Sequence, residues 1–221
     1  MKTTAAGKLT NRKPIPKEIY QPLSRLPEEL VLNTERAERV FIEIAKIIKD
    51  DYGFEVCFSS KLGSLKVKDK NTRQIRRFPR TGTFNGLEIK ISPDLVPSER
   101  LFTMLHLFGH SVQCCSPSES EIVNEFYNTP DDSGKKLEVL RKYEFRAAEF
   151  GMYLLNKVDP YLSGWFTDFV HTDHNMVAQT ICTGQLPQIT HCFVRDGKHI
   201  VPHKIPDDLR PHNVNRTSVA Y

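Results

Sequence analysis

The sequence lacks a hydrophobic run long enough to cross a membrane. A transmembrane helix needs about 20 consecutive apolar residues, and no stretch of this chain approaches that length. The lysine-rich residues 1–17 are not followed by the apolar segment that a secretory signal contains. We therefore expect a cytoplasmic protein without a membrane partner.

The sequence also lacks a C-x-x-C pair, the spacing that marks many zinc and redox sites. An odd number of cysteines without a signal peptide favours reduced thiols. The two adjacent cysteines allow a metal-ligand or redox role, although buried free cysteine is common and needs neither. The cysteines are Cys57, Cys114, Cys115, Cys182 and Cys192.

Internal repeats and a strong charge imbalance are absent as well. The 221 residues fit one domain, and the net charge of +4 is too small to argue by itself for a nucleic-acid partner. We expect three parts along the chain. They are a basic, proline-rich arm over residues 1–30, a folded domain over residues 31–185 and a C-terminal extension over residues 186–221.

The first part of the folded region mixes helical and strand-like patterns. Apolar residues recur at helical spacing after Asn33 and Thr34, which are suitable caps, and Gly53 is a suitable end. Short runs with strand character follow, and apolar and polar residues alternate strictly in the last run. These runs cover residues 54–58, 64–68 and 87–91.

Helical patterns dominate the remainder of the chain. A helix capped by Ser98 is apolar on most sides, which predicts a central, buried position. Further helices are expected over residues 135–156, 159–169 and 173–182, with a helical turn at 121–127. A strand at 192–194 is expected to pair back on Ile200 and Val201. These patterns predict an α+β fold, with a small, partly antiparallel sheet beside a helical bundle.

Two histidines in the apolar helix carry the strongest functional signal. His106 and His110 stand four residues apart, so on a helix both imidazoles lie on one face and can reach one metal ion. This is the spacing of the H-E-x-x-H zinc motif. Leu107, however, stands where that motif has the glutamate that activates water. Such a pair also occurs as hydrogen-bonded core histidines without a metal, and this alternative stays open.

A third protein ligand is needed, since catalytic zinc usually has three protein ligands and a water. Glu144 is the best candidate, because it shares one face of the 135–156 helix with small residues that let two helices approach closely. Glu149 lies further round that helix and is a weaker candidate. The sequence therefore predicts a Zn²⁺ site formed by His106, His110 and Glu144.

Two segments, SERLFTMLHLFGH and YEFRAAEFGMYLL, together resemble the ImmA/IrrE family of zinc metallopeptidases. The resemblance covers about residues 35–156 and implies a zincin-like fold for the 31–185 domain. It also implies zinc binding, hydrolysis of a peptide or protein, and a partner such as a transcriptional regulator. The matching positions are Phe102, Thr103, His106, Gly109, His110, Glu144, Ala147, Phe150, Leu154 and Leu155.

The departures from the family's pattern bear on activity. Leu107 replaces the catalytic glutamate, while Arg146 and Ala148 replace an acidic residue and an asparagine. General acid–base catalysis contributes about 10²–10⁴-fold in rate, so we expect variant or weakened hydrolase activity. A catalytically inactive, protein-binding regulator is the alternative. Three residues are candidates for a substitute catalytic group, although they can equally form a polar helix end: Asp168, Asp173 and His174.

Basic residues are concentrated between residues 61 and 80. A hairpin with this charge can follow nucleic-acid phosphates, or it can be a solvated edge that discourages aggregation. The chain has no helix-turn-helix signature and no aromatic RNP pattern to strengthen the first interpretation. The candidate nucleic-acid residues are Lys68, Lys70, Arg73, Arg76 and Arg77.

Overall fold

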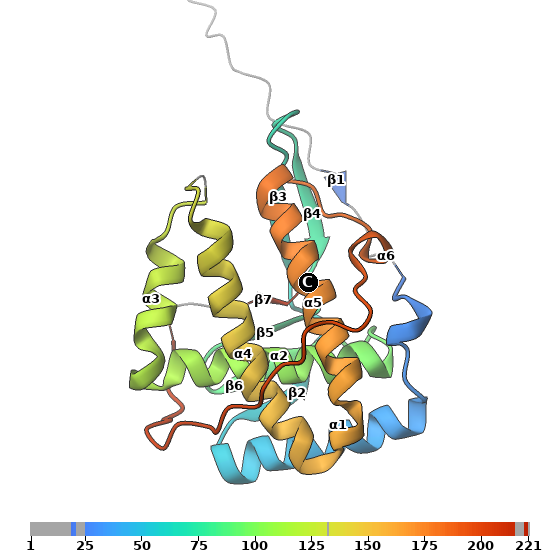
Figure 1. Cartoon of the computed structure of the whole chain (residues 1–221), viewed down its shortest axis with the longest axis vertical. Coiled ribbons are helices and arrows are strands. Elements are labelled where there is room, and N and C mark those ends of the chain that lie inside the picture. Colours follow the sequence, from blue (N-terminus) through green and yellow to red (C-terminus); the bar gives the residue numbers. More distant parts are fainter. Residues whose placement is uncertain (1–18, 21–24, 132, 215–218, 221) are drawn as a thin grey trace, which may run out of the picture.

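The computed structural model in Figure 1 describes residues 19–20, 25–131, 133–214 and 219–220. Most of the expected arm over residues 1–30 therefore lies outside the described residues. Helices and short strands combine in an α+β fold, which confirms the predicted α+β class, although the strands form two small sheets where one was expected. Within the described ranges, no helix is long and apolar enough to cross a membrane.

The first helix, α1 (Thr34–Tyr52), has the ends that the sequence predicts. The Asn33 side chain accepts a hydrogen bond of 3.1 Å from the Arg36 backbone N–H, and Gly53 ends the helix at a φ of 76°. This left-handed conformation favours glycine. The buried face of α1, which includes Val40 and Ile44, packs in the main core against the next helix.

Helix α2 (Pro97–Cys115) is buried along almost its whole length, as predicted. Its N-cap is Val96, whose backbone N–H donates to the Glu99 carboxylate at 3.1 Å. The prediction of Ser98 as the cap was wrong, because Pro97 already fits the first helical position. The Ser98 hydroxyl instead accepts a bond of 2.8 Å from the Leu32 N–H and so holds the segment before α1.

Two small sheets lie beside the helices. In the first, with order β2-β6-β5-β7, β2 is parallel to β6 and β5 is antiparallel to both of its neighbours. In the second, with order β1-β4-β3, β3 and β4 form an antiparallel hairpin and β1 is parallel to β4. The strands are β1 (Ile19–Tyr20), β2 (Glu55–Phe58), β3 (Ser64–Lys68), β4 (Ile75–Pro79), β5 (Gly82–Phe84), β6 (Glu88–Ile91) and β7 (Val219–Ala220).

The remaining helices surround α2. They are α3 (Ser120–Asn128), α4 (Lys136–Val158), α5 (Ser163–Thr183) and the short α6 (Ile189–Cys192), with 3₁₀ turns η1 (Glu28–Leu30), η2 (Pro117–Glu119) and η3 (Pro160–Leu162). The two helices predicted over 159–169 and 173–182 are one continuous helix, so that prediction was wrong. No glycine or proline interrupts the chain between them, and the Thr172 hydroxyl donates to the Asp168 carbonyl within the helix at 2.7 Å.

The expected hairpin near the C-terminal end does not form. Cys192, where the first strand was expected to begin, is the last residue of α6. Ile200, expected in the second strand, is buried in the main core with Ile205 and Leu209. The Arg210 backbone N–H donates to the carbonyl of Cys115, the last residue of α2, at 3.0 Å. Burial of these apolar side chains against the helices outweighs the local turn signal.

Gly109 sets the distance between α2 and α4. A Cβ atom at this position would overlap the carbonyl group of Ala147 on α4. We expect Gly109→Ala to separate the two helices and lower the free energy of unfolding by about 1–3 kcal/mol or more. Chemical denaturation measures this. Gly164→Ala is the matched control, since nothing lies within 4 Å of its added Cβ; equal effects of both changes would contradict the account.

Candidate metal centre

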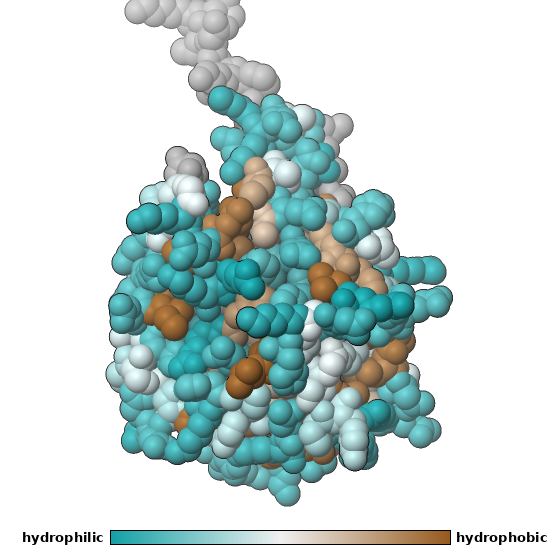
Figure 2. Space-filling view, in the orientation of Figure 1, coloured by the Kyte–Doolittle hydropathy of each residue, from teal (hydrophilic) through white to brown (hydrophobic). Residues whose placement is uncertain are grey.

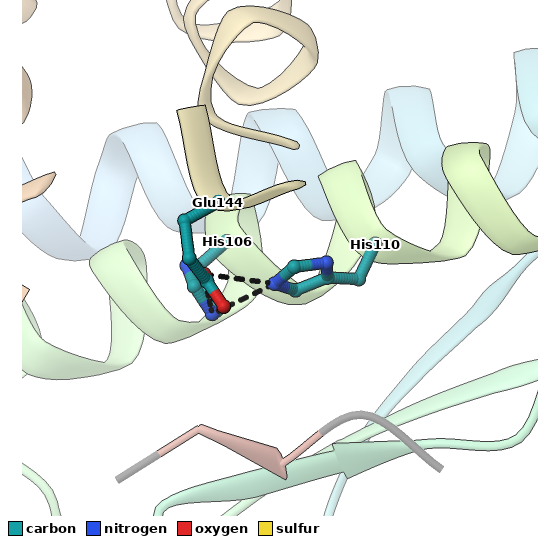
Figure 3. A group of neighbouring side chains, drawn as sticks. All are labelled: His106, His110 and Glu144. Carbon is teal, nitrogen blue, oxygen red and sulfur yellow. Dashed lines mark hydrogen bonds and ion pairs between the residues drawn. The ribbon is translucent and has the colours of Figure 1, made fainter. Parts of the chain in front are cut away.

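Three side chains from α2 and α4 converge at the point where these helices approach most closely. His106 and His110 project from one face of α2, and Glu144 reaches them from α4 (Figure 3). The Nε2 atoms of the two histidines are 3.2 Å apart. The Glu144 Oε2 atom lies 3.2 Å from the His110 Nε2 atom and 3.7 Å from the His106 Nε2 atom. The structure therefore brings together the three predicted ligands.

These separations fit a shared metal ion. All three potential ligand atoms lie within 4.8 Å of one another. Zinc bonds of about 2.0–2.1 Å at tetrahedral angles place two ligand atoms about 3.3 Å apart. The side chains of His106, His110 and Glu144 are only 7%, 2% and 12% exposed. The group can hold a metal ion, and its nitrogen and carboxylate donors are those that Zn²⁺ accepts.

Gln113 fixes the orientation of His110. The Gln113 side-chain NH₂ donates to the Tyr143 carbonyl at 2.8 Å, so its Oε1 atom faces the Nδ1 atom of His110, also at 2.8 Å. Nδ1 must then carry the proton, and the lone pair on Nε2 faces the other two ligands. Sequence reasoning missed Gln113, although its position three residues after His110 on the same helix could have indicated it.

Burial sets the protonation state of the ligands. It lowers the pKa of His106 to about 4; the charge of His110 contributes to the lowering and Glu144 opposes it. For Glu144, burial raises the pKa, but the charge and hydrogen bond of His110, together with the charges of His106 and His174, outweigh it and the net shift is downward. Neutral imidazole and ionised carboxylate are the forms that bind metal, so at neutral pH both residues are ready to coordinate.

Leu107 packs against the sheet. Its side chain is fully buried. A Cβ atom added to Gly82 on β5 would lie 2.6 Å from the Leu107 Cδ1 atom, so the strand passes directly over this side chain. The position that holds the catalytic glutamate in the H-E-x-x-H motif therefore belongs to the packing between α2 and the sheet.

The candidate substitute groups lie on α5 in different environments. Asp168 accepts a bond of 2.8 Å from the Gly197 N–H and holds that loop in place. Burial raises the pKa of Asp173 well above its usual value, and the negative charge of Glu144 adds to this. Burial also lowers the pKa of His174, although Glu144 opposes that shift. Asp173 and His174 are thus close enough to sense the charge of Glu144.

Arg146 has a structural partner. Its guanidinium binds both carboxylate oxygens of Glu119, at 2.9 Å and 2.6 Å, and also binds Glu149 at 2.9 Å. These contacts join α4 to the start of α3. They also occupy Glu149, which lies outside the His/His/Glu group.

The basic band lies on the β3–β4 hairpin, which projects from the helical body (Figure 1). Figure 2 shows that this end of the molecule is hydrophilic. Lys68, Lys70 and Arg73 are exposed, whereas Arg77 is half-buried. The Arg76 Nη2 atom lies 3.6 Å from the Oδ2 atom of the buried Asp69. The inner face of the hairpin packs through Phe78 against α5 and α6. The five candidate residues are therefore not equivalent, and a nucleic-acid role for them stays a prediction.

Removing the Gln113 amide should weaken metal binding without removing a ligand. Partners that orient a metal-binding histidine typically contribute 10–100-fold in affinity, so Gln113→Leu should raise the dissociation constant for Zn²⁺ by about that factor. Competition with a chelating dye measures it. Gln185→Leu, at a glutamine that binds Asp69, is the control. An unchanged affinity in Gln113→Leu would contradict this role.

Comparison with known proteins adds no independent assignment. No family model, no curated protein and no solved structure matches the chain. The resemblance to the ImmA/IrrE family thus stays a hypothesis based on two segments of sequence. The structure itself gives an α+β fold and a buried group of His106, His110 and Glu144 that can hold a metal ion.

Proposed function

We propose that this protein binds Zn²⁺ and is a metallopeptidase-like relative of the ImmA/IrrE family with weakened hydrolase activity. The observation that carries the proposal is the convergence of His106, His110 and Glu144 from two helices. Two imidazoles and a carboxylate are a common ligand set for catalytic zinc, which leaves one position for water or substrate. Bound Zn²⁺ supplies Lewis-acid activation of that water or of a carbonyl oxygen.

The chain's own residues determine how much of this chemistry is available. Gln113 holds the proton of His110 on Nδ1, and burial keeps His106 neutral, so both histidines present lone pairs. Leu107 cannot accept a proton from water. Because general base catalysis contributes about 10²–10⁴-fold, hydrolysis without a substitute base should be slow.

An extended peptide is the substrate class that the surroundings favour. Strand β5 lies against α2 and already carries an extended segment on its outer edge, with Ala220 opposite Gly82 in antiparallel register. Sheet edges bind peptides mainly through backbone hydrogen bonds. A substrate peptide could therefore pair with this edge of β5, beside α2, in place of the 219–220 segment.

A second candidate function is a catalytically inactive module that binds a protein, such as a transcriptional regulator. The full burial of Leu107 against β5 favours it, because an apolar residue there stabilises the core and contributes nothing to proton transfer. The two candidates share the metal site and the peptide-binding edge. They differ in whether bound peptide is cleaved.

Restoring a carboxylate at position 107 separates the two functions. We expect Leu107→Glu to raise zinc-dependent cleavage of a fluorogenic peptide library by about 10²–10⁴-fold over Leu107→Gln, which has the same size without a base. Both variants should remain folded by circular dichroism, although each buries a polar group and loses stability.

The wild-type protein provides the remaining comparison. Slow, chelator-sensitive cleavage by wild type would support the weakened enzyme, and no detectable cleavage would support the binding module. Equal rates for zinc-loaded, folded Leu107→Glu and Leu107→Gln would contradict the proposal that the missing base limits hydrolysis.

A further inference from the structure

A small cavity with a few polar lining residues lies between the N-terminal half of α2 and helix α5. Its volume is about 30 Å³, and Thr81, Glu99, Phe102 and Asp173 are among its lining residues. A cavity of this size holds one or two water-sized groups. Phe102, which lines it, also stacks on His106 with ring centroids 5.6 Å apart, so the cavity is a neighbour of the ligand group.

Two buried polar groups at this cavity lack partners. Asp173 is 7% exposed, and in the part of the chain that the structure describes its carboxylate has no hydrogen bond or ion pair. Thr81 is 4% exposed, and its hydroxyl has no partner among the described residues. Buried polar groups are paired in the great majority of cases, with protein or with ordered water, so these two are free to pair with a group that occupies the cavity.

The cavity is lined by acidic side chains. Glu99 contributes a second carboxylate, while none of the described lining residues is basic. The rings of Phe102 and Phe169, stacked with centroids 3.8 Å apart, form an aromatic wall. Carboxylates attract cations. Asp173, Glu99 and Thr81 together present oxygen acceptors for a group that carries several N–H donors.

The cavity opens into a larger groove that can admit a ligand. The groove, with a volume of about 660 Å³, shares Leu26, Thr81 and Glu99 with the cavity. From there it extends over Arg80 and Asp94 toward the start of α2. A side chain or chain end lying in the groove could thus place its terminal group beside Asp173.

We infer that this cavity binds a primary ammonium group, supplied by a lysine side chain or by the N-terminal amine of a peptide in the groove. The –NH₃⁺ group has three donors and no acceptor, which matches the three acceptor side chains. It is also compact, which suits a small cavity. The inference rests on the proposed function in one respect, which is that the ligand is a peptide.

Three matched peptides test this inference. One is N-acetylated with a central norleucine, the second is N-acetylated with lysine at that position, and the third has norleucine and a free N-terminal amine. We expect at least one of the two charged peptides to bind the full chain at least about tenfold more tightly than the neutral peptide, by calorimetry. The stronger of the two identifies the source of the ammonium group.

Asp173→Asn should remove this preference and keep or raise the thermal stability, since it removes an unpartnered buried carboxylate. Asp50→Asn, at an exposed position on α1, is the control and should leave the preference intact. Thr81→Val, which removes only the hydroxyl, should reduce the preference in the same direction and remains a test if Asp173→Asn does not fold.

Any of three results would overturn the inference. These are equal binding of all three peptides, no binding of either charged peptide, and a preference that persists in both Asp173→Asn and Thr81→Val. Measuring with and without added Zn²⁺ separates it from the proposed function. A charge preference in a protein that takes up no zinc would leave the cavity assignment standing and remove the metallopeptidase-like function.

Discussion

The close contact between α2 and α4 is the constraint on which the site depends. Gly109 has no side chain, and a Cβ there would overlap the Ala147 carbonyl group. Because the helices are close, the Glu144 Oε2 atom lies 3.2 Å from the His110 Nε2 atom. The Gln113 side-chain NH₂ can also donate to the Tyr143 carbonyl at 2.8 Å. Ligand placement and ligand orientation thus follow from one helix contact, made possible by a missing methyl group.

The residue at position 107 affects both the stability of the core and the chemistry that is possible at the site. A carboxylate there would accept a proton from bound water, but it would also have to be buried under β5 without a solvating partner. Leu107 avoids that penalty and adds apolar contact with the strand at Gly82. The contacts of the neighbouring histidines are made with other residues: both lie near Glu144 on α4, and His110 also bonds to Gln113. Under the proposed function, metal binding would thus depend on His106, His110 and Glu144, whereas hydrolysis would depend on the residue at position 107.

The parts predicted from sequence are those that depend on local periodicity. The spacing of His106 and His110 and the helical pattern around Glu144 are local, and the structure joins them as expected. Strands β4 and β5 were missed, since their arginines and short length hide any alternation, and α5 was wrongly divided. The partners of Gln113 and the cavity at Asp173 arise from contacts between distant segments, which no single-sequence pattern encodes.

The most direct test of the account is the zinc content of the purified full chain by elemental mass spectrometry. His106→Ala removes a proposed ligand, and His199→Ala, at an exposed histidine, is its control. The account predicts about one zinc ion per chain in wild type and His199→Ala, and loss of zinc in His106→Ala. A folded wild-type protein that takes up no zinc even after incubation with the metal would contradict it.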